Sequence, residues 1–330
     1  MRKISTSYNS VYGAEIKAFI KIKKKLGFKY KTGAAILSLF DRMAYKRNEK
    51  SQGINRAFAD SWCQKRPNES IRYRYDRVRH IAQFSLHLCD LGIPSFVPKL
   101  PPFPNSTFIP YIYSKDQLRD IFKASDKLRS GKVPMKSSLI SIPALVRFLY
   151  ATGLRINEAL ALQDDDVNLQ EAFLKVKDSK NNKERIIPIS SSLVAVLKQY
   201  NSYKAMLPVP KKSGYFFVNL IGKKCGYGSV GYWFKECLHD AGIKCVGRTG
   251  LPRLHDLRHT FAVTSLASMA EAGIDLYASL PILSTYLGHQ SLGATNHYVR
   301  LTSNMYPDLI KDVDTICLDV FPKLNFYEAD

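Results

Sequence analysis

HDLRHTFA occupies residues 255–262, and on a helix it brings His255, Arg258 and His259 within one turn of one another. Residues three or four apart share a helix face, so His255 lies beside Arg258 or His259. A zinc site would pair the two histidines. No glutamate lies between them as in a zinc protease motif, and Arg258 would repel a cation. We therefore expect no metal at this segment.

Two further segments carry reactive side chains: GLRINEAL at 153–160 and LGHQSLGATNHY at 287–298. Between GLRINEAL and HDLRHTFA, the segments 172–178 (AFLKVKD) and 184–190 (ERIIPIS) are rich in β-branched and apolar residues. The turn residues SKNNK separate them, which predicts a β-hairpin. Each of these segments alone is a weak indication of function. Their order and spacing along the chain are more specific.

The charge balance indicates a polyanionic partner. Lys and Arg number 49 against 28 Asp and Glu, a net charge of +21. Residues 1–112 hold 21 basic and 7 acidic side chains, so most of the excess lies in the N-terminal part. Such an excess is costly without a polyanion nearby, which favours nucleic acid. The alternative is a soluble enzyme with an incidental basic surface.

The six cysteines form no C-x-x-C pair, so the sequence indicates neither a zinc site nor a disulfide framework. The first ten residues, MRKISTSYNS, have no signal-peptide character, and Arg147 interrupts the most apolar stretch, 138–154. We expect a cytoplasmic protein with no membrane partner.

The first hundred residues predict a small helical bundle. Apolar residues recur at spacings of three and four over 14–28, 33–47 and 74–93. Several arginines come early in the last of these helices, before its apolar face. Phosphate contact is the functional interpretation and a solvated helix face is the alternative. These arginines are Arg72, Arg74, Arg77 and Arg79.

The proline-rich stretch 93–114 lacks either periodicity and is typical of a semi-rigid linker. We predict a helical domain at 1–100, a linker at 101–113 and a second domain at 114–330. Ser114 is a plausible N-cap for the next helix. Within the last domain the periodicity predicts helices at 114–128, 138–154, 191–207 and 230–243.

GLRINEAL, HDLRHTFA and LGHQSLGATNHY, in this order and at this separation, resemble the three signature boxes of the tyrosine recombinases, the phage integrase family. The hairpin before HDLRHTFA resembles the family's catalytic-lysine hairpin. The resemblance covers most of residues 110–302, and the N-terminal bundle is similar to the core-binding domain in layout. It implies a mainly α fold with a small β-sheet (α+β), made of a helical SAM-like core-binding domain and a mixed α/β catalytic domain.

Carried over residue by residue, the resemblance assigns a catalytic set and one supporting residue, Glu158. Tyr298 is the nucleophile, nine residues after His289. The lysine falls on Lys180, with Asn181 in place of a usual glycine and Lys177 and Lys183 close by. The implied catalytic residues are Arg155, Lys180, His255, Arg258, His289 and Tyr298.

These residue types suit metal-free phosphoryl transfer. Two guanidinium groups bind the charge that builds on the non-bridging phosphate oxygens. A tyrosine hydroxyl has a pKa of about 10 and needs an acceptor or a positive field. His255 and the arginines would supply these, and a lysine would protonate the departing 5′ oxygen. The 3′-phosphotyrosyl link keeps the energy of the broken bond, so neither ATP nor another cofactor is needed.

The resemblance further implies a site-specific recombinase or integrase of a mobile element, acting at the bacterial nucleoid on double-stranded DNA with paired recombination sites. It implies a homotetramer on synapsed DNA, with accessory proteins as possible partners. Near the C-terminus, apolar residues recur at helical spacing and form a stripe. This stripe would dock either on a neighbouring subunit, as in the family, or on the core of its own chain. Its members are Leu309, Val313, Ile316 and Val320.

Two other functions stay open at this point. One is a type IB topoisomerase, which shares the cleavage chemistry but exchanges no strands between partners. The interval from His289 to Tyr298 and the N-terminal bundle with its linker count against it. The other is a non-catalytic DNA-binding protein on a recombinase scaffold, against which the complete catalytic set stands.

Overall fold

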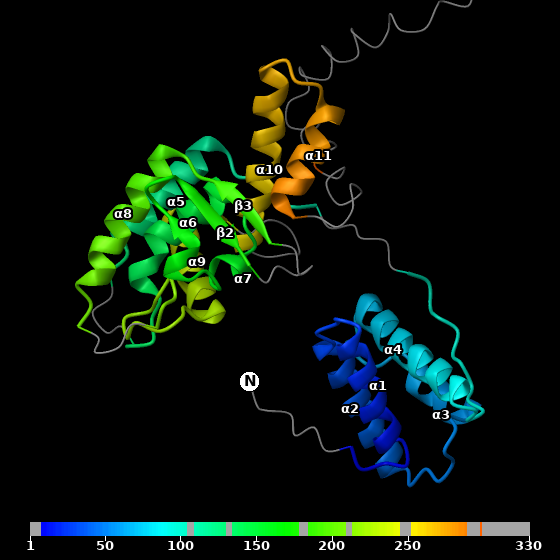
Figure 1. Cartoon of the computed structure of the whole chain (residues 1–330). Helices are drawn as coiled ribbons and strands as arrows, with labels where there is room; N and C mark the ends of the chain where they lie inside the picture. The colour runs from blue at the N-terminus through cyan, green and yellow to red at the C-terminus, as the bar shows by residue number, and fades with distance from the viewer. Residues whose placement is uncertain are drawn as a thin grey trace, which may run out of the picture. The chain divides into compact units, whose positions relative to one another are not determined.

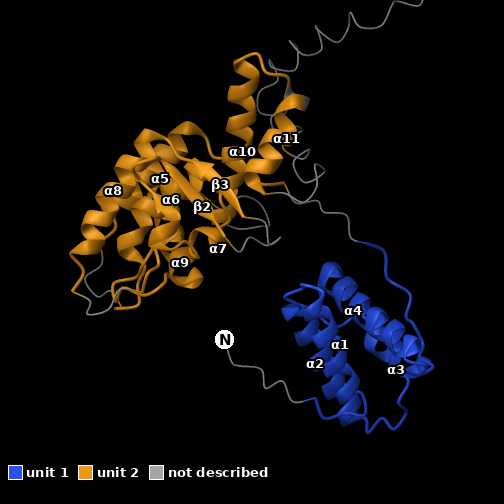
Figure 2. Ribbon diagram, in the orientation of Figure 1, with its two compact units in different colours: residues 1–108 blue, residues 109–330 orange. Residues whose placement is uncertain are grey.

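Helices dominate the computed structural model, and its described part contains one antiparallel sheet of three strands. This confirms the predicted α+β class. The chain divides into two compact units, 1–108 and 109–330, and the division falls inside the predicted linker (Figure 2). The residues that the structure describes are 8–103, 109–129, 134–177, 184–208, 213–244, 252–288 and 298.

The first unit is built on four helices, shown in blue and cyan in Figure 1. Aromatic side chains dominate its core, with Phe40, Trp62 and Phe84 fully buried. The three helices predicted here are confirmed, while a fourth of eight residues, α3, was not predicted. The helices are α1 Gly13–Lys25, α2 Lys31–Lys46, α3 Arg56–Cys63 and α4 Ile71–Asp90.

The prediction that Arg77 contacts phosphate is wrong, because the residue is fully buried. Its Nε lies 2.7 Å from Oε1 of Glu69, which is also buried, and its Nη atoms donate to the carbonyls of Trp62 and Gln64. Burial alone would raise the pKa of Glu69, but the hydrogen bond and charge of Arg77 outweigh burial and lower it. The physical reason lies in the helical repeat. Residues 77, 81, 84 and 88 form the stripe of α4 that faces the core.

The second unit forms around α6 Ile142–Thr152, whose side chains are largely buried. This helix packs against α5, α8, α9 and α10. Ser114 caps α5 as predicted, in a capping box with Gln117. Figure 1 shows α10 and α11, in yellow and orange, side by side at one end of this unit. The other helices are α5 Lys115–Lys127, α7 Ile156–Ala159, α8 Ser191–Ala205, α9 Tyr227–Asp240, α10 Leu254–Glu271 and α11 Leu276–Leu287.

The predicted hairpin is confirmed by the strands β2 Phe173–Val176 and β3 Arg185–Pro188, which pair antiparallel. The short strand β1 Val167–Asn168 pairs with β2 and extends the sheet. In this register Val176 lies opposite Arg185, the first residue of β3. The hairpin therefore delivers Arg185 to the end of the sheet from which the turn leaves. The turn itself, 178–183, lies outside the described residues.

The chain enters the second unit through a buried aromatic residue. Tyr113, the last residue of the predicted linker, is 2% exposed, and its backbone N–H donates to Oγ1 of Thr260 on α10 at 3.0 Å. The tyrosine ring packs in the core of this unit. The end of the predicted linker is therefore anchored to the helix that carries HDLRHTFA.

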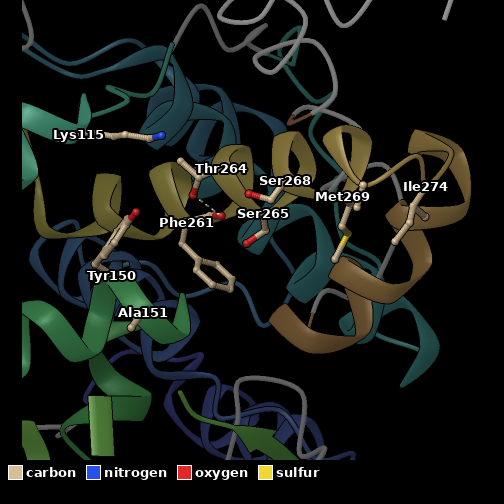
Figure 3. A pocket seen from close by; sticks show the side chains of 10 residues that line it. Lys115, Tyr150, Ala151, Phe261, Thr264, Ser265, Ser268, Met269 and Ile274 are labelled. Carbon is tan, nitrogen blue, oxygen red and sulfur yellow. Dashed lines mark hydrogen bonds between the residues drawn. The ribbon is translucent and has the colours of Figure 1, made fainter. Parts of the chain in front are cut away.

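A cleft of about 570 Å³ lies beside α10, and none of the predicted catalytic residues lines it. Figure 3 shows its aromatic and small polar side chains, among them Tyr150, Phe261, Thr264 and Ser268. The predicted catalytic residues of α10 therefore lie outside the lining of this cleft.

Two kinds of feature are absent from the described ranges. No helix there is long and apolar enough to cross a membrane. Within the same ranges, no group of three His, Cys, Asp or Glu side chains is arranged to hold a metal ion.

Candidate active site

Arg155 stands at the start of α7, directly after the turn that ends α6. The turn requires a glycine, because Gly153 has a φ of +58° and a Cβ there would lie 2.3 Å from the Phe261 ring. Arg155 Nη1 donates to Oε1 of Glu158 at 2.9 Å, and Nη2 donates to the carbonyl of Gly288 at 3.3 Å. The guanidinium is thus held between the first motif and the third.

Arg258, on α10, bridges the same two motifs from the core side. It is 2% exposed, and its Nη atoms donate to the carbonyls of Gly153 at 2.7 Å and Leu287 at 2.9 Å. Burial and the nearby charge of Arg155 lower its pKa to about 10, so it stays protonated at neutral pH. The two predicted phosphate-binding arginines therefore lie together, joined through the turn at 153 and the end of α11.

Tyr298, the predicted nucleophile, lies against this pair. The residue is 3% exposed and packs with Leu283 and Leu287 of α11. Its hydroxyl lies 3.0 Å from Nδ1 of His259 and is also hydrogen-bonded to Arg258. Burial raises the pKa of Tyr298, and the charge and hydrogen bond of Arg258 counteract only part of that rise. The hydroxyl is therefore protonated at neutral pH and needs a proton acceptor to attack.

The histidine on the tyrosine hydroxyl is His259, whereas the sequence analysis assigned an acceptor role to His255. The two rings are perpendicular, with centroids 4.8 Å apart. Although His255 is an exposed residue, surrounding protein and the charge of Arg258 lower its pKa to about 4. His255 is thus neutral at neutral pH. The signal for His259 was available in the sequence, since it directly follows Arg258 in HDLRH.

Glu158, the predicted supporting residue, is shared by two arginines. Its carboxylate accepts from Arg155 at 2.9 Å and from Arg185 of β3 at 3.0 Å. Burial alone would raise its pKa, but Arg185 and then Arg155 outweigh burial and hold the pKa below its usual value. Arg185 Nε also donates to the carbonyl of Tyr286 at 3.0 Å. The sequence analysis did not include Arg185, which lies in the hairpin segment outside the three boxes.

Two predicted catalytic residues, Lys180 and His289, lie outside the described residues. Lys183, one of the alternatives for the general acid, does so too. Lys177, the other alternative, is described, and its Nζ forms an ion pair with Asp166. The structure therefore brings together Arg155, Arg258, Tyr298 and both histidines of α10, while the lysine assignment stays a prediction.

Three arginines of α4 stay candidates for phosphate contact after the exclusion of Arg77. Arg72 is exposed and stacks on Phe103, with 4.7 Å from its guanidinium carbon to the ring centroid. Arg72 and Arg79 each contact Asp76, at 3.2 Å and 3.1 Å. Arg74 Nε donates to the carbonyl of Cys63.

Comparison with known proteins agrees with this geometry. Residues 112–305 match the model of the phage integrase family. The protein y4rB of Sinorhizobium fredii, named as an integrase/recombinase, is 28% identical over 92% of this chain and 96% of its own length. Tyrosine recombinase XerD of Listeria innocua is 30% identical over 62% of each chain. A crystal structure of XerH site-specific recombinase bound to difH superposes with a TM-score of 0.61 at 19% identity, covering 81% of this chain and 76% of that one.

The matched region, 112–305, covers more than half of the 330 residues and contains all three motifs. The likeness to XerH lies in the fold. The two proteins similar in sequence, y4rB and XerD, are both named as recombinases, which agrees with the resemblance of the motifs. This chain belongs to the phage integrase family.

Proposed function

We propose that the protein is a site-specific DNA recombinase or integrase that cuts and rejoins DNA through a 3′-phosphotyrosyl intermediate. One observation carries this proposal: the hydroxyl of Tyr298 is hydrogen-bonded to both His259 and Arg258, and Arg155 lies close to Arg258. A nucleophile, a proton acceptor and two fixed cations thus meet at one point. This set matches the needs of an in-line attack on a phosphodiester.

The proposed chemistry proceeds in two steps. The Tyr298 oxygen attacks the scissile phosphorus and gives its proton to a histidine, while Arg155 and Arg258 bind the non-bridging oxygens. The bond from phosphorus to the 5′ oxygen breaks, and Lys180 protonates that oxygen. The 5′ hydroxyl of a partner strand then attacks the phosphotyrosine and gives its proton to Lys180, while the departing Tyr298 oxygen takes its proton back from the histidine. Because the phosphotyrosine keeps the bond energy, the reaction needs neither metal nor ATP.

The other predicted residues have roles in the same proposal. Neutral His255 would donate a hydrogen bond to a phosphate oxygen, since its lowered pKa leaves an N–H without a charge. His289 would contact the phosphate from the third motif, as the family resemblance implies. Glu158 would hold Arg155 in place. These roles rest on the resemblance together with the positions of the described side chains.

DNA binding is proposed to involve both units. The N-terminal part carries two thirds of the net charge, and Arg72, Arg74 and Arg79 lie on one helix of the first unit. Phosphate contacts from such residues fix a protein on DNA without reading its sequence. We therefore place non-specific affinity in the first unit and cleavage in the second.

The assembly and cellular setting are also proposals. By analogy with the family, we propose a homotetramer on two synapsed DNA sites, at the bacterial nucleoid, moving a phage or transposon with or without accessory proteins. The apolar stripe proposed to join neighbouring subunits lies at 309–320, outside the described residues. Topoisomerase activity is the less favoured alternative, because the relatives carry recombinase and integrase names.

The test is a covalent-trapping assay. Nicked duplexes covering the DNA on either side of the gene would be incubated with the purified protein in EDTA and run on a denaturing gel. A protein-linked DNA band that Tyr298→Phe abolishes would support metal-independent phosphotyrosine chemistry. Strand transfer between two duplexes would then distinguish a recombinase from a topoisomerase. Binding without an adduct on any duplex would overturn the proposal in favour of a DNA-binding protein.

A further inference from the structure

The C-terminal end of α11 is held by three arginines. The carbonyl groups of its last two residues and of the following residue, Gly288, each accept a hydrogen bond from a different guanidinium. The pairs are Arg185 Nε with Tyr286 at 3.0 Å, Arg258 Nη2 with Leu287 at 2.9 Å, and Arg155 Nη2 with Gly288 at 3.3 Å. Carbonyls at a helix C-terminus carry partial negative charge, so cations are stabilising there. The chain then continues from this end towards Tyr298.

Two of these arginines are the predicted phosphate ligands, and the third, Arg185, has no assigned role. Its side chain is 11% exposed, and it comes from β3, which no box of the family signature contains. The guanidinium lies against Gly288 so closely that a Cβ at that position would be 2.9 Å from Nη1. Arg185 is therefore packed into the site by contacts on several sides.

Arg185 also shares the buried carboxylate of Glu158 with Arg155. Its Nη atoms lie 3.5 Å and 3.0 Å from the two carboxylate oxygens, while Arg155 takes one oxygen at 2.9 Å. Without Arg185, this carboxylate would face Arg155 as its partner. A paired fork of two parallel hydrogen bonds is the strongest geometry available to them. It would draw the Arg155 guanidinium away from a phosphate.

We propose that Arg185 is a positioning residue for DNA cleavage. Through Glu158 it keeps the Arg155 guanidinium available to the scissile phosphate. This inference rests on the proposed function. A displacement of about 1 Å at a reacting centre costs about 100-fold in rate. We expect a loss of that order in Arg185→Ala.

The experiment compares two substrates. One duplex carries an ordinary scissile phosphodiester, and the other carries a methylphosphonate, in which an uncharged methyl group replaces one non-bridging oxygen. The neutral centre depends less on a cation, so an Arg155→Ala defect shrinks on it. If Arg185 acts through Arg155, the Arg185→Ala defect shrinks as well. The rate of adduct formation is measured at saturating DNA, and the melting temperature and DNA affinity are recorded alongside.

A matched control separates this role from general stability. Arg147 of α6 forms a two-bonded ion pair with Asp126, at 2.8 Å and 2.7 Å, away from the predicted catalytic residues. Arg147→Ala should leave the cleavage rate unchanged on both substrates. An equal loss on both substrates in Arg185→Ala, or no loss, would overturn the proposal. Should Arg185→Ala fail to fold, Arg185→Lys, which keeps the charge but loses the fork, decides by the same comparison.

Failure of the proposed function gives a different result. In that case the wild-type protein forms no adduct on either duplex, whatever residue stands at position 185. The proposal for Arg185 concerns the ratio of rates on the two substrates, which is measured once wild-type cleavage has been seen.

Discussion

His259 offers the most direct test of the chemistry, because its Nδ1 lies 3.0 Å from the hydroxyl of Tyr298. That hydroxyl is buried and its pKa is raised, so at neutral pH it must lose a proton during the attack. With Nε2 protonated, Nδ1 is the acceptor for that proton. We predict that His259→Phe, which keeps a ring and removes the acceptor, slows formation of the phosphotyrosyl adduct.

The size of the effect follows from the contact. A buried hydroxyl that loses its hydrogen-bond acceptor costs about 1–3 kcal/mol, which corresponds to roughly 5- to 150-fold in rate. Proton acceptance in the transition state contributes about 10²–10⁴-fold in general. The two ranges overlap near 100-fold, and this is the expected loss. His259→Asn, which keeps a polar group near Nδ1 but takes up no proton, should recover binding geometry without recovering the rate.

The pH dependence gives a second readout. Without an acceptor, cleavage depends on the ionised fraction of Tyr298, which rises about tenfold per pH unit below the raised pKa. The rate of His259→Asn should therefore climb more steeply between about pH 7 and 9 than the wild-type rate does. The same nicked duplex is used, with single-turnover rates at each pH.

The control is His239→Phe on α9, a histidine whose side chain is 85% exposed and contacts Asp240. It should cleave at the wild-type rate at every pH. The reasoning about His259 is refuted if folded His259→Phe cleaves as fast as wild type with the same pH profile, while Tyr298→Phe forms no adduct.

Further predictions concern stability, DNA binding and cleavage. Arg77→Leu leaves the buried Glu69 carboxylate without its ion-pair partner, which should cost about 3–5 kcal/mol in urea unfolding. Exposed Arg72→Ala should leave the urea midpoint unchanged and reduce the salt dependence of DNA binding. The pKa of His255 is lower in the folded chain than its ordinary value of 6.5, so between about pH 6.5 and pH 4 the unfolded chain binds one more proton than the folded chain. The free energy of unfolding should therefore fall as the pH falls across that window. His255→Gln should remove this part of the fall. Gly153→Ala, at a φ of +58° and against Phe261, should lower the melting temperature and the cleavage rate together.

Local periodicity made most of the fold predictable. The apolar spacing of three and four over 33–47 and 191–207 corresponds to α2 and α8, and the change to β-rich segments corresponds to β2 and β3. The capping signal at Ser114 was also correct. Helix α3 was missed because eight residues hold about two turns, too few for a periodic pattern.

The arginines of α4 mark the limit of such reasoning. Spacing placed them on one helix, but the sequence did not reveal that Arg77 lies on the buried stripe with Glu69 as its partner. Its partner is eight residues away and reaches it through a turn that periodicity does not describe. Burial of a charge depends on such a tertiary partner, because an unpaired charge would not remain in the core.

The site divides in the same way. The sequence by itself determined the residue types and order of the three motifs, and hence the family and its expected nucleophile, because motif chemistry is local. Tertiary structure alone decided that His259 is the histidine on Tyr298, and that Arg185 shares Glu158 with Arg155. These contacts join residues 27 to 39 positions apart. They form because α10 packs against both α6 and α11, which brings distant segments of the chain together. No short-range sequence pattern predicts that packing.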